Sequence, residues 1–376
     1  MRVRVVALAV AAVALTGLVP RALAASSVAT LDIFALAQDD DGGQPLRAEG
    51  LRYGGLRMAL DYAFDDSLAM ALNVAGSLID NENTRPLPDT VDQVLTTQAS
   101  SQVLTLDAQA ALRFTPPESP ASFTAGLYYH HQRRFVSLGA DLTGQLDLAD
   151  SDTILALTYS FRLGILKPRR WDDLIMPFDY LRSHNLILSF TQNLSPSWLV
   201  NASVQYTRQD GDMQDAYNFV VLYDDVGTPV HLGFEQLPRE RDRVQVSGRV
   251  RWSPRHGLGF GLDGSLYGDD WGVVSGAVEP SVEIPLGATS RWRFWYRFAT
   301  QSRAKWFRER PTADATYQTQ DFDLDAWTMH SPGMMLVFPL RGDLARAWLG
   351  RLSLFAFFRS DGISAVGANL GASAVW

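Results

Sequence analysis

Residues 290–299 read SRWRFWYRFA and show the cleanest alternation of apolar and charged side chains in the chain. Its aromatic side chains fill the even positions 292, 294, 296 and 298, while arginines fill the odd positions 291, 293 and 297. A helix would scatter these arginines around its circumference, whereas a strand places them all on one face. The stretch therefore predicts a β-strand with one apolar face and one basic face.

The same alternation recurs from about residue 50 to the C-terminus, for example over 104–114, 198–207 and 243–252. The predicted strands are roughly ten to fourteen residues long, close to the ~9–11 residues of a tilted strand that crosses a bilayer. Strands of soluble proteins average only ~5–6 residues. Aromatic residues near the ends of the apolar faces, such as Trp198 and Trp252, match the interfacial girdles of a membrane barrel. We therefore expect an all-β transmembrane antiparallel meander β-barrel, with a secreted soluble β protein as the alternative.

Composition excludes several other classes of protein. The chain has 376 residues, of which 47 % are hydrophobic and 20 % charged, and it has no cysteine. Without cysteine it cannot be a disulfide scaffold, an iron–sulfur protein or a thiol enzyme. Because 41 acidic residues outnumber 33 basic ones, we expect no nucleic-acid partner.

The N-terminus predicts export from the cytoplasm. Residues 1–24 read as a cleaved signal peptide, with arginines at 2 and 4, an apolar run over 5–15 and a small-residue site at 22–24. The apolar run is too short to span a bilayer, and Pro20 and Arg21 interrupt it. We expect residues 25–50 to form an N-terminal segment that includes a first strand, and residues 51–376 to form a barrel in the cell outer membrane.

The breaks between strands predict the connections of a meander. Short breaks fall at 65–67, 116–120, 149–152, 194–197, 253–257, 287–290 and 341–346, and we expect periplasmic turns there. Longer polar stretches fall at 80–101, 164–181, 209–240 and 303–320, where we expect extracellular loops in strict alternation with the turns. Fifteen strands follow from about Leu51. Single-chain bacterial barrels have an even number, so we place a sixteenth at 28–38, with fourteen strands as the fallback.

If the apolar faces meet lipid, the charged faces line the lumen, because an arginine at the lipid midplane costs ~2–4 kcal/mol. The candidate lumen-lining residues are Arg243, Arg249, Arg251, Asp263, Glu279, Glu283, Arg291, Arg293, Arg297, Asp321, Asp323 and Asp325. We expect the three aspartates at 321–325 on the strand that follows Arg297. Two interpretations stay open. The charges form a self-neutralising network that stiffens the wall, or they line a selective passage for an anionic or zwitterionic solute.

The sequence offers no catalytic, cofactor-binding or metal-binding residue. It contains no GxSxG, HExxH, Walker A or dinucleotide motif. His130 and His131 are adjacent, so on a strand they point to opposite faces, and we expect them to be solvated at a strand–loop junction. Ser183 and His184 with an aspartate of the preceding loop make only a weak triad candidate. An outer-membrane hydrolase is therefore the minor alternative, and no cofactor is expected.

The central third carries a family resemblance. The stretches RSHN at 182–185, DAYNFV at 215–220, RERD at 239–242, YGDDWG at 267–272 and TQSRAKWF at 300–307 follow one another in order. In this order the chain resembles a family of uncharacterised outer-membrane barrel proteins of Gram-negative bacteria, known as a domain of unknown function. The resemblance covers about 51–376, although the chain ends on Trp376 rather than the commoner Phe. It implies a barrel in the outer membrane and transfers no catalytic residue.

These observations lead to two main functional hypotheses. The first is a channel or binding barrel with a charged lumen and an unidentified solute. The second is a structural or scaffold surface barrel that acts with a periplasmic partner. The family resemblance implies a partner linked to redox chemistry, because genes of this family resemble those found beside genes for thioredoxin-like and flavin-transfer proteins. The remaining expected partners are outer-membrane lipid and the barrel-assembly machinery.

Overall fold

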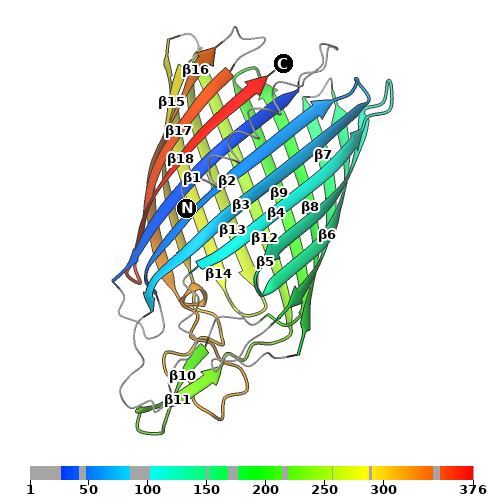
Figure 1. The fold of residues 1–376 in the computed structure, drawn as a ribbon. Helices are drawn as coiled ribbons and strands as arrows, with labels where there is room; N and C mark the ends of the chain where they lie inside the picture. Colours follow the sequence, from blue (N-terminus) through cyan, green and yellow to red (C-terminus); the bar gives the residue numbers. More distant parts are fainter. Residues whose placement is uncertain are drawn as a thin grey trace.

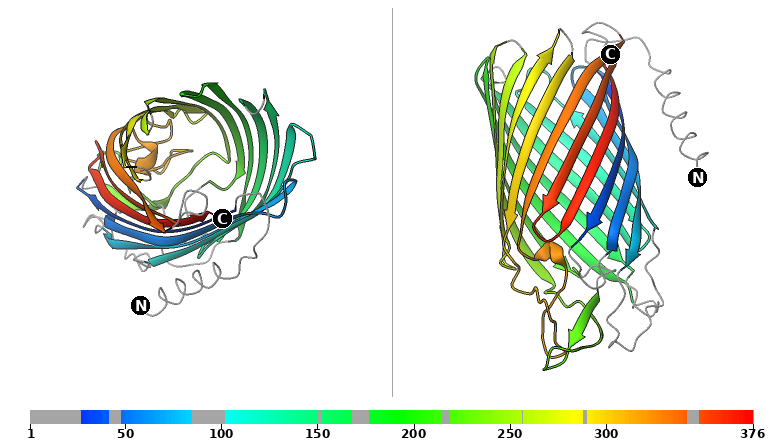
Figure 2. Two further views of the ribbon diagram at one scale, coloured as in Figure 1. Left: turned by 90° about the horizontal axis from the view of Figure 1, so that it is seen from above. Right: turned by 90° about the vertical axis from the view of Figure 1, so that its left-hand side faces the viewer.

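The protein is a closed β-barrel with a small folded cap at one end (Figures 1 and 2). The computed structural model describes residues 27–41, 48–84, 102–149, 152–167, 177–213, 219–255, 257–287, 290–341 and 348–375. The predicted signal peptide at 1–24 lies outside these residues, as do Trp376 and much of the predicted loops at 80–101 and 164–181. No helix in the described ranges is long and apolar enough to cross a membrane.

Sixteen antiparallel strands form the wall, which confirms the predicted fold class and strand number. Their bounds are β1 Val28–Asp40, β2 Ala48–Ala63, β3 Leu68–Thr84, β4 Gln102–Phe114, β5 Ala121–Gln132, β6 Phe135–Leu148, β7 Thr153–Leu166, β8 Asp179–Ser195, β9 Trp198–Gly211, β12 Glu240–Arg255, β13 Leu258–Asp269, β14 Val274–Leu286, β15 Ser290–Gln301, β16 Trp327–Arg341, β17 Trp348–Arg359 and β18 Ile363–Val375. Each strand pairs with the next one along the wall, and β1 closes the barrel against β18.

The outer surface of the wall is apolar. Leu104, Leu127 and Leu266 are each nearly 70 % exposed, and many other leucines, valines and aromatics share their side of the wall. An apolar surface this continuous is stable only against lipid, so the alternating pattern is that of a transmembrane barrel. Near the end that carries the short turns, Trp252 stacks on Trp198 with ring centroids 5.5 Å apart. This pair lies where a barrel presents aromatic side chains to the membrane interface.

The start of β1 and the end of β18 lie at the same end of the barrel as the short turns, because Val28 pairs with Val375. Asp65 shows how such a turn is held. Its Oδ1 accepts hydrogen bonds from the hydroxyl of Ser67 at 2.7 Å and from the backbone N–H groups of Ser67 and Leu68, each at 2.8 Å. The bond from the Ser67 hydroxyl is the main reason that the pKa of Asp65 falls below its usual range.

The opposite end of the barrel corrects one prediction. Strict alternation of short turns with long loops is wrong, because three connections at this end are also tight: 133–134 after β5, 270–273 after β13 and 360–362 after β17. Gly272 and Gly362 lie in two of them with φ of 87° and 94°. Glycine adopts such positive φ without strain, so these sequences close a hairpin in a few residues.

The seam between the first and last strands is tied by an ion pair. β1 and β18 pair over their full length, from Val28 opposite Val375 to Asp40 opposite Ile363. Arg351 on β17 reaches across β18 to Asp32 on β1, with Nη2 and Oδ1 2.5 Å apart. Gly371 lies between them, and a Cβ at that position would overlap Asp32 Oδ1.

The cap consists of residues 219–239 and 302–326, and it projects from the end of the barrel opposite the short turns (Figure 1). Its hairpin comprises β10 Phe219–Tyr223 and β11 Pro229–Phe234. The two segments join through a backbone bridge between Gln236 and Gln318, with N···O distances of 2.9 and 2.7 Å. Val220, Val221 and Phe307 are buried between them, so the cap has an apolar core of its own.

Candidate functional site

The strongest candidate site is the inner face of β12–β15. Odd-numbered residues of β12, β13 and β15 point into the barrel here, opposite the apolar outer face. Arg249 Nε and Arg251 Nη2, both on β12, each donate to a different oxygen of Asp263 on β13, at 2.7 Å. Asp263 is 20 % exposed and Arg251 29 %, so this is a partly buried, charge-assisted arrangement.

A second acidic node continues the network toward β15. Glu279 on β14 lies opposite Asp263 in the strand register. Arg293 Nη2 lies 3.4 Å from Glu279 Oε1 and 3.9 Å from Asp263 Oδ2, and Arg297 Nη1 lies 3.8 Å from Glu279 Oε2. Two carboxylates are thus shared among four arginines, and Arg293 is close to both of them.

The backbone makes room for this network. Gly261 faces Arg251 across the β12–β13 pair and Ser281 across the β13–β14 pair. A Cβ at Gly261 would come within 3.0 Å of both side chains. The Arg251 guanidinium can lie flat over the wall and reach Asp263 only because that position has no side chain.

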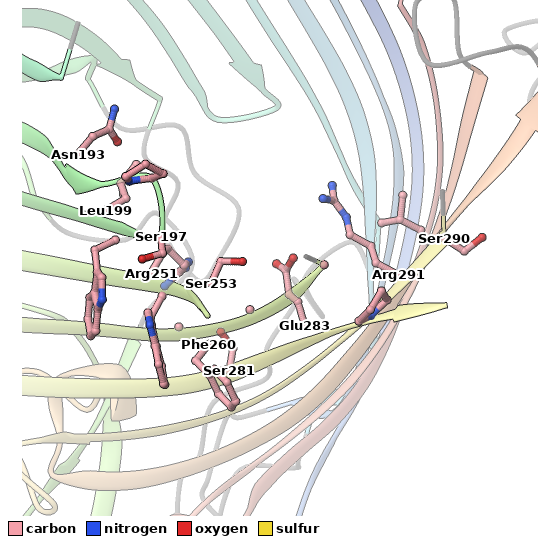
Figure 3. Close-up of a pocket in the computed structure, with 18 of the residues that line it drawn as sticks. Asn193, Ser197, Leu199, Arg251, Ser253, Phe260, Ser281, Glu283, Ser290 and Arg291 are labelled. Carbon is pink, nitrogen blue, oxygen red and sulfur yellow. The ribbon is translucent and has the colours of Figure 1, made fainter. Parts of the chain in front are cut away.

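At the end with the short turns, residues of β12–β15 and of the neighbouring turns line a cavity of about 1140 Å³. Glu283 and Arg291 line it, and Figure 3 shows both side chains projecting into the open space. Within the described ranges neither residue belongs to an ion pair. Glu283 lies opposite Arg293 in the register, so the cavity begins where the paired part of the network ends.

Arg243 is separate from the network described above. It lies near the cap end of β12, and its Nε is buried and has no hydrogen-bond partner among the described residues. Arg241, two residues earlier on β12, pairs with Asp269, and its Cζ lies 4.2 Å from the centroid of the Trp271 ring.

The placement predicted for the last three acidic residues is wrong. Asp321, Asp323 and Asp325 lie in the cap, around a short 3₁₀ helix at Phe322–Leu324, and β16 begins only at Trp327. Asp321 caps this helix by accepting from the Asp323 N–H at 2.9 Å. Asp323 pairs with Arg359 at 2.6 Å and Asp325 with Arg303 at 2.5 Å, so their charges are satisfied at the barrel rim.

Sequence reasoning missed a second charged cluster on the inner faces of β4–β7. His130 Nδ1 lies 2.8 Å from Asp107 Oδ1, which also accepts from the Tyr128 hydroxyl at 3.0 Å. Arg162 Nη2 donates to both carboxylate oxygens of Asp141, at 2.7 and 2.9 Å. The expectation of a solvated His130 is therefore wrong. The signal that could have found the pair is the spacing of Asp107 and His130 on the polar faces of adjacent predicted strands.

The weak catalytic candidates do not assemble. Ser183 accepts from Gln209 Nε2 at 2.9 Å on the inner face of β8. The neighbouring His184 forms a hydrogen bond of 2.8 Å, through Nδ1, with the hydroxyl of Tyr159, whose side chain lies on the outer face. The two side chains therefore lie on opposite sides of the wall. The described part of the chain holds no group of three metal-ligating side chains.

Comparison with known proteins supports the family resemblance. The family described as "Protein of unknown function (DUF3570)" matches residues 179–345, which run from β8 to β16. This match confirms the resemblance to a family of unknown function. No curated protein matches the chain.

Solved structures similar to this chain are barrels of low sequence identity. OpdK of Pseudomonas aeruginosa with vanillate shares 11 % identity at a TM-score of 0.44, over 93 % of this chain and 98 % of that one. The CymD monoaromatic hydrocarbon channel shares 10 % at 0.45, over 94 % and 88 %. The siderophore receptor PirA from Acinetobacter baumannii shares 8 % at 0.45, over 90 % and 53 %. Likeness at this level carries no information about a solute.

Proposed function

We propose that the protein is an outer-membrane channel whose arginine-rich wall favours small anionic or zwitterionic solutes. The observation that supports this proposal is the charge balance of the β12–β15 face. Five arginines, at 249, 251, 291, 293 and 297, face the carboxylates of Asp263, Glu279 and Glu283. Arginine stays charged at every physiological pH, so the face keeps an excess of positive charge.

The geometry also bears on the alternative of a purely stiffening network. Asp263 and Glu279 do neutralise much of the charge on Arg249, Arg251 and Arg293. Glu283 and Arg291, however, lie beside the cavity without an ion pair among the described residues, and they contribute no such cross-strand tie. Their exposure to the cavity favours contact with solute. If no solute passes, the alternative hypothesis remains, which is a structural barrel that acts with a periplasmic partner.

Ion selectivity in planar bilayers tests the proposal. The purified protein should give stepwise currents, and a salt gradient should give a reversal potential on the anion-selective side. A unit charge about 5 Å from a passing ion contributes about 0.8 kcal/mol in water, or about fourfold in local ion concentration. Arg291→Gln should therefore lower the anion-to-cation permeability ratio by about two- to fourfold at low salt, where screening is weak.

A matched control uses an arginine outside the lumen. Arg208 on the outer face of β9 pairs with Glu240 at 2.9 Å and with Asp242 at 3.3 Å. Arg208→Gln makes the same change in charge and should leave the permeability ratio unaltered. Absence of stepwise current at every voltage would remove the channel proposal and leave the structural reading. Recovery of the mature protein in the soluble periplasm, rather than the outer membrane, would remove both.

A further inference from the structure

A second, smaller cavity lies between the cap and the barrel wall. Its space of about 160 Å³ is roughly ten times the ~10–15 Å³ of comparable space that one water needs, so a small organic solute fits. The polar and aromatic side chains that line it are Gln209, Glu235, Arg241, Arg243, Trp271 and Asp321. Wall residues of β9 and β12 thus face cap residues that are distant in sequence.

β12 supplies a cation, Arg243, that has no ion pair among the described residues. Arg241 is already paired with Asp269, whose side chain is fully buried. Arg243 has no ion pair within the described ranges, and its Nε is buried without a partner. A buried donor on a charged group is costly to leave unpaired, so this atom is suited to a ligand oxygen. A carboxylate would supply that oxygen together with the opposite charge.

The other side of the cavity supplies acceptors. Gln209 donates through Nε2 to Ser183 at 2.9 Å, while its buried Oε1 accepts no hydrogen bond from the part of the chain that the structure describes. Glu235 on the cap is 2 % exposed and accepts a hydrogen bond from the Thr319 hydroxyl. Asp321 adds a second carboxylate at the lining. These oxygens favour a bound ammonium group, and the two carboxylates disfavour a solute that carries only negative charge.

We infer that this cavity binds a small zwitterion of the α-amino-acid type. Its carboxylate would meet Arg243, its ammonium group would meet Gln209 and Glu235, and an aliphatic side chain would pack on the leucines at 181, 237 and 324, which also line the cavity. The inference rests on the proposed channel function, because it names the class of solute admitted at the cap end. Trp271, which is 3 % exposed, closes one side of the cavity.

Calorimetric titration of the purified barrel in detergent tests the inference without requiring conduction. Three probes isolate the two charges: leucine, 4-methylpentanoate, which lacks the ammonium group, and 3-methylbutylamine, which lacks the carboxylate. Leucine should bind at least about tenfold more tightly than either analogue, since a hydrogen bond lost from a buried charged group costs on that order. Because this comparison uses the unaltered protein, it does not depend on the folding of any variant.

Two variants then assign the contacts. Arg243→Gln should weaken leucine by tenfold or more and leave 3-methylbutylamine unchanged, whereas Glu235→Gln should weaken leucine and not 4-methylpentanoate. Arg208→Gln, on the outer face, should leave all three affinities unchanged. Equal affinity for the three probes, or no binding of leucine, would overturn the inference. A barrel that conducts without binding leucine would retain the channel proposal, and one that binds leucine without conducting would retain the site alone.

Discussion

Gly371→Ala should weaken the barrel at its seam. The added Cβ would overlap Asp32 Oδ1 and come within 3.1 Å of Arg351 Nη2. The Asp32 carboxylate must then move away, and its ion pair with Arg351 breaks. At a wall glycine with open space around it, such as Gly144, replacement by alanine is neutral or slightly favourable, because alanine lowers the entropy of the unfolded chain.

The size of the effect follows from the exposure of the pair. The Asp32 side chain is 12 % exposed, but that of Arg351 is 40 % exposed, so solvent screens part of the attraction. We therefore expect a loss of about 1–2 kcal/mol, between the values for exposed and for buried pairs. In an Asp32→Ala background the same glycine replacement should cost almost nothing, because the group that it displaces is already absent.

Urea-induced unfolding in lipid vesicles, followed by tryptophan fluorescence, measures the difference. The midpoint should fall for Gly371→Ala at an unchanged dependence on urea. Gly144→Ala is the matched control, because a Cβ at Gly144 meets no atom of a described residue within 4 Å. Equal midpoints for the two variants would refute the role of the ion pair. An undiminished cost of Gly371→Ala in the Asp32→Ala background would do the same.

Four further predictions concern the wall and the cap. Phe294→Arg should impair assembly by placing a charge in lipid at ~2–4 kcal/mol, while Arg293→Ala assembles normally. In intact outer membranes, a cysteine at 293 should react with a small aqueous thiol reagent and one at 294 should not; equal labelling would contradict the orientation of β15. Asp263→Asn should raise anion selectivity in bilayers by leaving two guanidinium groups without their shared acceptor, and an unchanged reversal potential would count against a charged conduction path. Arg359→Ala should loosen segment 302–326 around Phe322 and Asp323, because Arg359 contacts the Asp323 carboxylate and the Phe322 carbonyl. Limited proteolysis should then cut this segment sooner than in the unaltered protein, while heat-modifiable gel migration stays the same.

The barrel wall was predictable because each strand carries its own evidence. Alternation depends only on neighbouring residues, so the strand at 290–301 could be located without knowing its partners. The first strand alternates weakly and was placed at 28–38 by the rule that such barrels have an even number of strands; the structure has it at Val28–Asp40. Lipid outside the wall makes the pattern strict, since a misplaced charge there is costly.

The cap was not predictable in the same way. Its contacts join segments about eighty residues apart, as between Gln236 and Gln318, and no local periodicity encodes them. Asp321, Asp323 and Asp325 alternate with apolar residues and so imitate a strand, although the partners that decide their conformation are Arg303 and Arg359. The pairing of His130 with Asp107 was hidden for a related reason, because it depends on the register between two strands.

Because the cap has an apolar core of its own, the folding of this chain depends on two solvents: lipid around the wall and water around the cap. In the described part of the protein, most of the fully buried large side chains, among them Val220, Thr319 and Phe307, lie in the cap rather than in the wall. The wall keeps its apolar residues outside, where lipid covers them, and the cap keeps them inside, as a water-soluble protein does. Detergent or a change of lipid should therefore act on the wall and spare the cap, whereas urea should release the cap first. Hydrogen exchange should then show two cooperative units, with the cap opening at a free energy below that of the barrel.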